Sequence, residues 1–124
     1  MKFVGKREAP MTLSKQRKLL GNHLNFAAAE AYKLLRTNLM FALPNNNECR
    51  VIGITSALRG EGKSTTSVNL AYTIAQTGER VLMIEADMRL PNVAQRLALR
   101  PTLGLSDLLA GLCTREEAIQ ESGM

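Results

Sequence analysis

The chain has 124 residues, enough for one small domain, and 45% of them are apolar, so a hydrophobic core can form. Only 4% are aromatic, which indicates an aliphatic core. There is no apolar run of about 18 residues and no apolar segment of a secretory signal near the N-terminus, so we expect neither a membrane-spanning helix nor a cleaved leader.

The net charge of +5 comes from the N-terminal segment. Residues 1–20 contain six basic residues and one acidic residue, whereas the remainder of the chain is balanced. Together with Pro10, this composition predicts a basic, flexible arm over residues 1–25. Such an arm contacts anionic lipid, nucleic acid or an acidic partner, or stays solvated. Because Phe3 is the arm's one aromatic residue, nucleic-acid binding is not expected.

Residues 26–41 predict an amphipathic helix, which Pro44 and the asparagines at 45–47 end. We assign residues 26–44 to this helical segment. One face of the helix repeats at i, i+3 and i+4, and it consists mostly of apolar residues: Ala27, Ala31, Leu34, Leu35, Asn38 and Leu39.

A glycine-rich loop follows the apolar segment 51–55, a predicted strand, and precedes residues 64–76, a predicted helix that Gly78 closes. The loop fits the phosphate-binding pattern G-x-x-x-x-G-K-[ST] except at its first position, which is Ala57. Glycines let the backbone wrap closely around a phosphate, and the amides at the helix start point at the anion. The alternative is a glycine turn that happens to precede a lysine at a helix start.

The loop predicts an ATP site with Mg²⁺. Lys63 is expected to reach the β- and γ-phosphates, and the hydroxyl of Ser64 to ligate the metal. The predicted nucleotide-binding residues are Gly60, Glu61, Gly62, Lys63, Ser64 and Thr65.

A second predicted strand, residues 81–84, makes a right-handed βαβ unit with the first. The expected fold class is therefore α/β, with a three-layer parallel sheet as in P-loop NTPases. Two strands form a poor sheet, and no apolar strand ending in a metal-binding Asp follows Ile84, so we expect an incomplete domain. Three short helices are predicted after the second strand, at residues 92–99, 105–110 and 115–121.

The segment after the second strand carries Glu85, Asp87 and Arg89. Carboxyl ends of parallel strands share one edge of a sheet, so these residues are expected to lie near the phosphate loop. Asp87 is predicted to hold a Mg²⁺-bound water, and Glu85 to orient or deprotonate an attacking hydroxyl. Together with Lys63, these three residues are the predicted catalytic set; the alternative is a solvated turn with an Asp87–Arg89 surface pair.

The two cysteines, Cys49 and Cys113, lie far apart and show no metal-ligand spacing. Beside a nucleotide loop, they are interpreted as reduced thiols of a cytoplasmic protein.

Four ordered segments between residues 27 and 111 resemble the cytoplasmic ATPase domain of bacterial protein-tyrosine kinases that regulate capsule and exopolysaccharide synthesis. The matching segments are residues 30–39, 55–65, 85–91 and 104–111. The resemblance implies that residues 45–124 form the N-terminal portion of a MinD-like P-loop domain. It also implies that this domain uses Mg-ATP and transfers the γ-phosphate to tyrosine.

The resemblance assigns the family's phosphate-loop lysine and serine to Lys63 and Ser64. The family's second motif has the form Asp-x-Asp-x-Arg, and Asp87 and Arg89 match its last two positions. Glu85 stands at the first position, where its carboxylate is one methylene further from the backbone, which alters the geometry.

The resemblance also implies partners. Glu30, Lys33 and Arg36 stand where the family has Glu-x-x-Arg-x-x-Arg, a helix that contacts a neighbouring subunit, so a homo-oligomer is expected. A transmembrane activator at the inner face of the membrane and protein tyrosine substrates are implied as well. The family's C-terminal tyrosine cluster is absent, and Tyr32 and Tyr72 fall in predicted helices.

Two other functions stay open. A MinD/ParA-type ATPase switch usually has a second lysine in the loop, where this chain has Leu58. A truncated, non-catalytic interaction module would keep the helix at residues 26–44 without turning nucleotide over.

Overall fold

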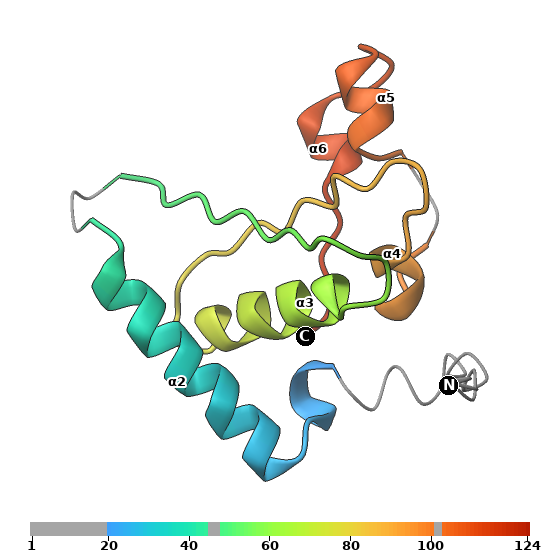
Figure 1. Ribbon diagram of the computed structural model, residues 1–124. Helices are drawn as coiled ribbons and strands as arrows, with labels where there is room; N and C mark the ends of the chain where they lie inside the picture. The colour runs from blue at the N-terminus through green and yellow to red at the C-terminus, as the bar shows by residue number, and fades with distance from the viewer. Residues whose placement is uncertain (1–19, 45–47, 101–102) are drawn as a thin grey trace, which may run out of the picture.

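The structure, a computed structural model, describes residues 20–44, 48–100 and 103–124. Of the predicted basic arm, residues 1–19 therefore lie outside the described residues. Within these described ranges, a 3-10 turn and five α-helices follow one another (Figure 1). They are η1 (Gly21–His23), α2 (Phe26–Ala42), α3 (Lys63–Ala75), α4 (Val93–Arg96), α5 (Leu105–Leu109) and α6 (Arg115–Ala118).

The long helix α2 begins where the sequence predicts. Asn25 caps it, because the side-chain oxygen accepts a hydrogen bond from the amide of Ala28 at 2.8 Å. The helix packs against α3 near the C-terminal end of α3 (Figure 1). The mostly apolar face is largely exposed: of its six residues, five are exposed, and Leu34 is 63% exposed. The half-buried positions instead include Tyr32, Arg36 and Met40.

α3 is the central element of the described chain. Its middle residues Val68, Asn69 and Leu70 are buried, and so is Thr73 one turn later. The side-chain oxygen of Asn69 accepts from the backbone amide of Gly21 at 2.8 Å. This bond satisfies a buried amide group and ties η1 to the helix.

A small core forms on the same helix. Leu20, Val68 and Val93 are buried together, and Met83 and Leu97 pack partly against them. These residues join the N-terminal turn, α3, α4 and the segment before α4. The core therefore holds α4 beside the N-terminal end of α3, as Figure 1 shows.

The predicted parallel sheet is not confirmed, because the residues that the structure describes contain no β-strand. Residues 51–55 and 81–84 are irregular, and Val51, Leu82 and Ile84 are 88%, 61% and 60% exposed. A strand of a parallel sheet needs hydrogen-bonding neighbours and a cover on both faces. The exposure of these apolar side chains shows that the described residues supply no such cover.

The C-terminal part holds two short helices that pack on each other, α5 and α6. The hydroxyl of Thr114 accepts from the amide of Glu117 at 3.3 Å, and the carboxylate of Glu117 accepts from the amide of Thr114 at 2.8 Å, which is a capping box. The pKa of Glu117 is lowered chiefly by the Thr114 amide, and further by the Thr114 hydroxyl, which donates to the same carboxylate at 3.1 Å. The predicted helices at 92–99, 105–110 and 115–121 are confirmed with shorter bounds.

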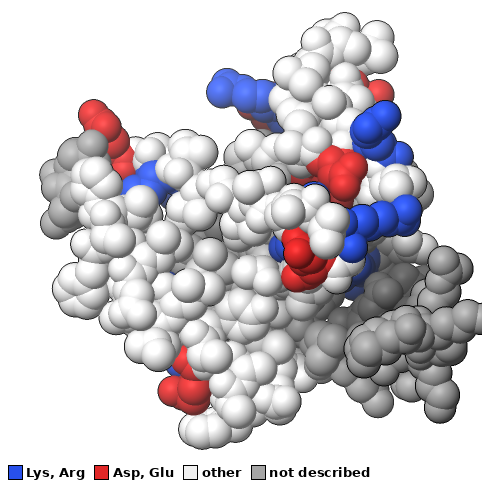
Figure 2. All heavy atoms as spheres, in the orientation of Figure 1, with Lys and Arg blue, Asp and Glu red and all other residues white. Residues whose placement is uncertain are grey.

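Within the described ranges, no helix combines the length and the apolar character needed to cross a membrane. Both cysteines are free thiols, Cys49 exposed and Cys113 half-buried. Figure 2 shows a largely uncharged surface over α2, whereas charged side chains gather on the side where α4, α5 and α6 lie.

Candidate nucleotide site

The phosphate loop owes its shape to two glycines. Gly60 and Gly62 both have φ of +89°, a left-handed conformation that residues with side chains rarely adopt. A Cβ at either position would meet no atom within 4 Å. The backbone conformation, and not crowding, is therefore what requires glycine, and the loop's inner surface stays open.

Hydrogen bonds from side chains of the loop itself also stabilise its shape. The carboxylate of Glu61 accepts from the amide of Leu58 at 3.0 Å, and the hydroxyl of Ser56 donates to the carbonyl of Leu58 at 3.2 Å. Both bonds turn the chain before the second glycine. Glu61 thus serves the loop through its own side chain as well as its backbone.

α3 begins at Lys63, directly after Gly62. The amide of Thr66 bonds to the carbonyl of Gly62 at 2.8 Å, which closes the first turn. The amides before Thr66 lie in the first turn of a helix, where backbone N–H groups have no partner in the helix. Lys63, Ser64 and Thr65 are therefore placed as an anion-binding helix start requires.

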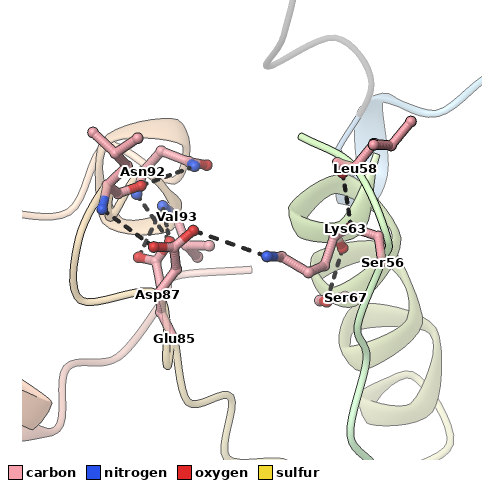
Figure 3. Close-up of polar contacts among 9 residues, drawn as sticks. Ser56, Leu58, Lys63, Ser67, Glu85, Asp87, Asn92 and Val93 are labelled. Carbon is pink, nitrogen blue, oxygen red and sulfur yellow. Dashed lines mark hydrogen bonds and ion pairs between the residues drawn. The ribbon is translucent and has the colours of Figure 1, made fainter. Parts of the chain in front are cut away.

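The second motif faces the first. The ammonium of Lys63 lies 3.9 Å from a carboxylate oxygen of Asp87, and both side chains point into the same space (Figure 3). The other oxygen of Asp87 accepts from the amide of Leu90 at 3.2 Å, which fixes the carboxylate. The alternative pair between Asp87 and Arg89 is not found in the described part of the chain.

Glu85 has a different environment. One of its carboxylate oxygens accepts from the amides of Asn92 at 2.9 Å and Val93 at 3.2 Å, and the other accepts from Val93 at 3.1 Å. Asn92 is the N-cap residue of α4, yet its own side chain makes no capping bond. Glu85 therefore caps α4 from the acidic segment that precedes this helix (Figure 3).

Arg96, which sequence reasoning did not select, reaches the site from α4. Its Nη1 donates to the hydroxyl of Thr65 at 3.0 Å. The Nε of Arg96 is buried and has no hydrogen-bond partner among the described residues. The sequence carries one signal for Arg96: it is a basic residue in a predicted short helix that follows the acidic segment.

Comparison with known proteins gives the family of the chain that carries this candidate site. A family described as the AAA domain matches residues 49–123, which is more than half of the chain. The chain belongs to the AAA domain family. The match includes both the phosphate loop and the acidic segment.

Curated relatives of this AAA domain protein include bacterial proteins named tyrosine-protein kinases and one named a succinoglycan biosynthesis transport protein. The tyrosine-protein kinase YwqD of Bacillus subtilis (strain 168) is 44% identical over 94 residues, which are 76% of this chain and 39% of that protein. The tyrosine-protein kinase CpsD of Streptococcus agalactiae is 35% identical over 96 residues, covering 77% of this chain and 41% of that protein. The succinoglycan biosynthesis transport protein ExoP of Rhizobium meliloti (strain 1021) is 45% identical over 65 residues, covering 52% of this chain and 8% of that protein.

The chain thus spans about two fifths of the length of the two kinases. No solved structure matches it significantly.

The oxygen donors of the AAA domain fit Mg²⁺ with a nucleotide. In the described ranges, no group of three or more His, Cys, Asp or Glu side chains is placed to hold a metal ion. A magnesium ion needs few protein ligands, because phosphate and water complete its shell. One hydroxyl at Ser64 and one carboxylate at Asp87 are a donor set of that kind, and the open loop leaves room for phosphate.

The helix α2 precedes the AAA domain. Lys33 pairs with Glu30 at 2.7 Å, and both side chains are 48% exposed. Arg36 instead donates to the carbonyl of Thr73 in α3 at 2.7 Å. The three residues of the predicted subunit contact therefore divide into an exposed ion pair and a bond within the chain.

Proposed function

We propose that this chain supplies the nucleotide-binding part of an ATP-dependent protein-tyrosine kinase that regulates capsular or extracellular polysaccharide biosynthesis. The approach of Lys63 to Asp87 at 3.9 Å carries the proposal, because it joins the phosphate loop to a carboxylate. The relatives named tyrosine-protein kinases and the succinoglycan biosynthesis transport protein support the reaction and its context.

In this proposal, each residue has a distinct role. Lys63 binds the β- and γ-phosphates of ATP and offsets the charge that develops during transfer. Ser64 and Asp87 hold the metal, Ser64 through its hydroxyl and Asp87 through a water molecule. Bound Mg²⁺ neutralises phosphate charge and holds the transferred group in line.

Other residues around the proposed metal site bind the phosphates or add positive charge. The amides from Gly60 to Thr65 bind phosphate oxygens, and Arg89, which is exposed, adds positive charge on the acidic segment. A role for Glu85 as the base that accepts the tyrosine proton stays a prediction. Its two oxygens already accept amide protons of α4, which weighs against that role.

The proposal extends to partners. The exposed pair Glu30–Lys33 and neighbouring Arg36 form a contact between copies of the chain, which assembles a homo-oligomer. A transmembrane activator holds the kinase at the cytoplasmic face of the membrane, and proteins with tyrosine residues are the substrates. The sequence resemblance supports the oligomer and the activator, and the relatives named tyrosine-protein kinases support protein tyrosine as the substrate.

Calorimetric titration with Mg-ATP tests the proposal. The chain should bind Mg-ATP, and Lys63→Ala should remove detectable binding because the phosphates lose their charged partner. Arg80→Ala is the matched control, since Arg80 is an exposed basic residue after α3 and away from the loop. Equal affinity of the Lys63→Ala variant and the unmodified chain would refute the assignment.

A further inference from the structure

The phosphate loop is held by α4 as well as by α3. Arg96 ends α4, and its guanidinium donates to Thr65 Oγ1 at 3.0 Å. Thr65 belongs to the first turn of α3, the turn whose amides face the phosphates. One charged side chain therefore connects the two helices at the point where the nucleotide is received.

α4 is too short to keep its place by itself. It has four residues, Val93–Arg96, fewer than an isolated helix needs. Two contacts hold it: Val93 is buried against Val68 of α3, and Glu85 caps its first amides. The position of Arg96 is thus fixed by packing and by a carboxylate from the acidic segment.

We propose that Arg96 is a positioning residue for the nucleotide: through Thr65 it holds the start of α3 in the orientation that receives the phosphates. The inference rests on the proposed function, because it concerns the affinity for Mg-ATP. Arg96 acts through the hydroxyl of Thr65. Loss of the Arg96 guanidinium or of the Thr65 hydroxyl therefore releases the same turn of α3. Loss of both groups should lower the Mg-ATP affinity no further than loss of one.

A double-mutant cycle separates this role from simple structural support. Arg96→Leu and Thr65→Val are each expected to weaken Mg-ATP binding about tenfold, since each removes a charge-assisted hydrogen bond. The double variant should bind as weakly as either single variant.

Thermal unfolding accompanies each titration, and Arg100→Leu is the matched control because Arg100 is exposed just beyond α4. If Arg96→Leu does not fold, Arg96→Gln, which keeps a polar side chain, replaces it in the cycle. Losses that multiply in the double variant overturn the proposal, and so does an unchanged affinity of the Arg96 variant. A chain that binds no Mg-ATP overturns the proposed function as well, whereas binding that depends on Lys63 but not on Arg96 overturns this inference alone.

Discussion

Lys63 and Asp87 come from separate motifs, yet their charged groups lie 3.9 Å apart. The side chains are 39% and 38% exposed, so water screens the pair, and its contribution to folding is small, about 0–1 kcal/mol. The importance of the contact is its position. It brings the ammonium of one motif and the carboxylate of the other face to face (Figure 3), as the proposed phosphate and metal roles require.

Asp87→Asn tests the metal role of this carboxylate. The amide keeps the size of the side chain and an oxygen that can accept from Leu90, but it loses the charge that favours Mg²⁺. We expect that Mg²⁺ no longer strengthens ATP binding, while binding in the presence of a chelator is unchanged or tighter. Titrations with and without Mg²⁺ measure both. Glu121→Gln, a change at an exposed acid, is the control, and a full Mg²⁺ effect in Asp87→Asn would contradict the assignment.

Glu85 has two candidate roles, the cap of α4 and the base that accepts the tyrosine proton. Variants that change the length of its side chain distinguish them. Glu85→Asp withdraws the carboxylate by one methylene from the amides of Asn92 and Val93, whereas Glu85→Gln keeps an acceptor at the same reach. If capping is the main role, Glu85→Asp weakens Mg-ATP binding several-fold more than Glu85→Gln, because an N-cap contributes about 1 kcal/mol. Calorimetry measures the Mg-ATP affinities of both variants. Weaker binding by Glu85→Gln than by Glu85→Asp would contradict the capping role.

Gly62→Ala is expected to destabilise the loop. Residue 62 has φ of +89°, which costs an L-residue about 1–2 kcal/mol, and an added Cβ meets nothing within 4 Å, so the cost is purely conformational. Gly53→Ala is the matched control, because its Cβ also meets open space and its φ is not positive. Urea unfolding compares the two. Equal free energies of unfolding would show that the loop readily adopts another conformation.

The capping box of α6 should open in acid. The Thr114 amide and hydroxyl hold the pKa of Glu117 below its ordinary value. A lowered pKa means that the capping stabilisation is present above the ordinary pKa, near 4.5, and is lost as the pH falls through the lowered value. Carboxyl carbon shifts in an NMR titration report this pKa directly. Thr114→Ala removes the hydroxyl but keeps the amide, so the pKa of Glu117 should rise part of the way toward that of an ordinary glutamate, and an unmoved value would exclude the hydroxyl as a cause.

The helices could be predicted because local chemistry marks their ends. Asn25 begins α2, Gly62 precedes α3, and Gly78 follows α3 with φ of +88°. The spacing of apolar residues identifies the apolar face of α2, but it does not predict which residues pack against α3. In the structure, the half-buried positions include Arg36, a charged residue whose guanidinium finds a carbonyl of α3.

The site could be predicted in part. The loop pattern and the carboxylates after residue 84 are local signals, and the Lys63–Asp87 contact agrees with them. The capping bonds of Glu85 span 7 or 8 positions, and the bond from Arg96 to Thr65 spans 31. The spacing of residues in the sequence does not predict such hydrogen bonds, because they depend on where α4 packs.

α3 receives a contact at each end. The phosphate loop precedes its first residue, and the carbonyl of Thr73 in its last turn accepts from Arg36 of α2. A helix of 13 residues is about 20 Å long and stiff along its axis. The hydrogen bond from Arg36 therefore connects α2, through this one stiff helix, to the turn that directly follows the phosphate loop.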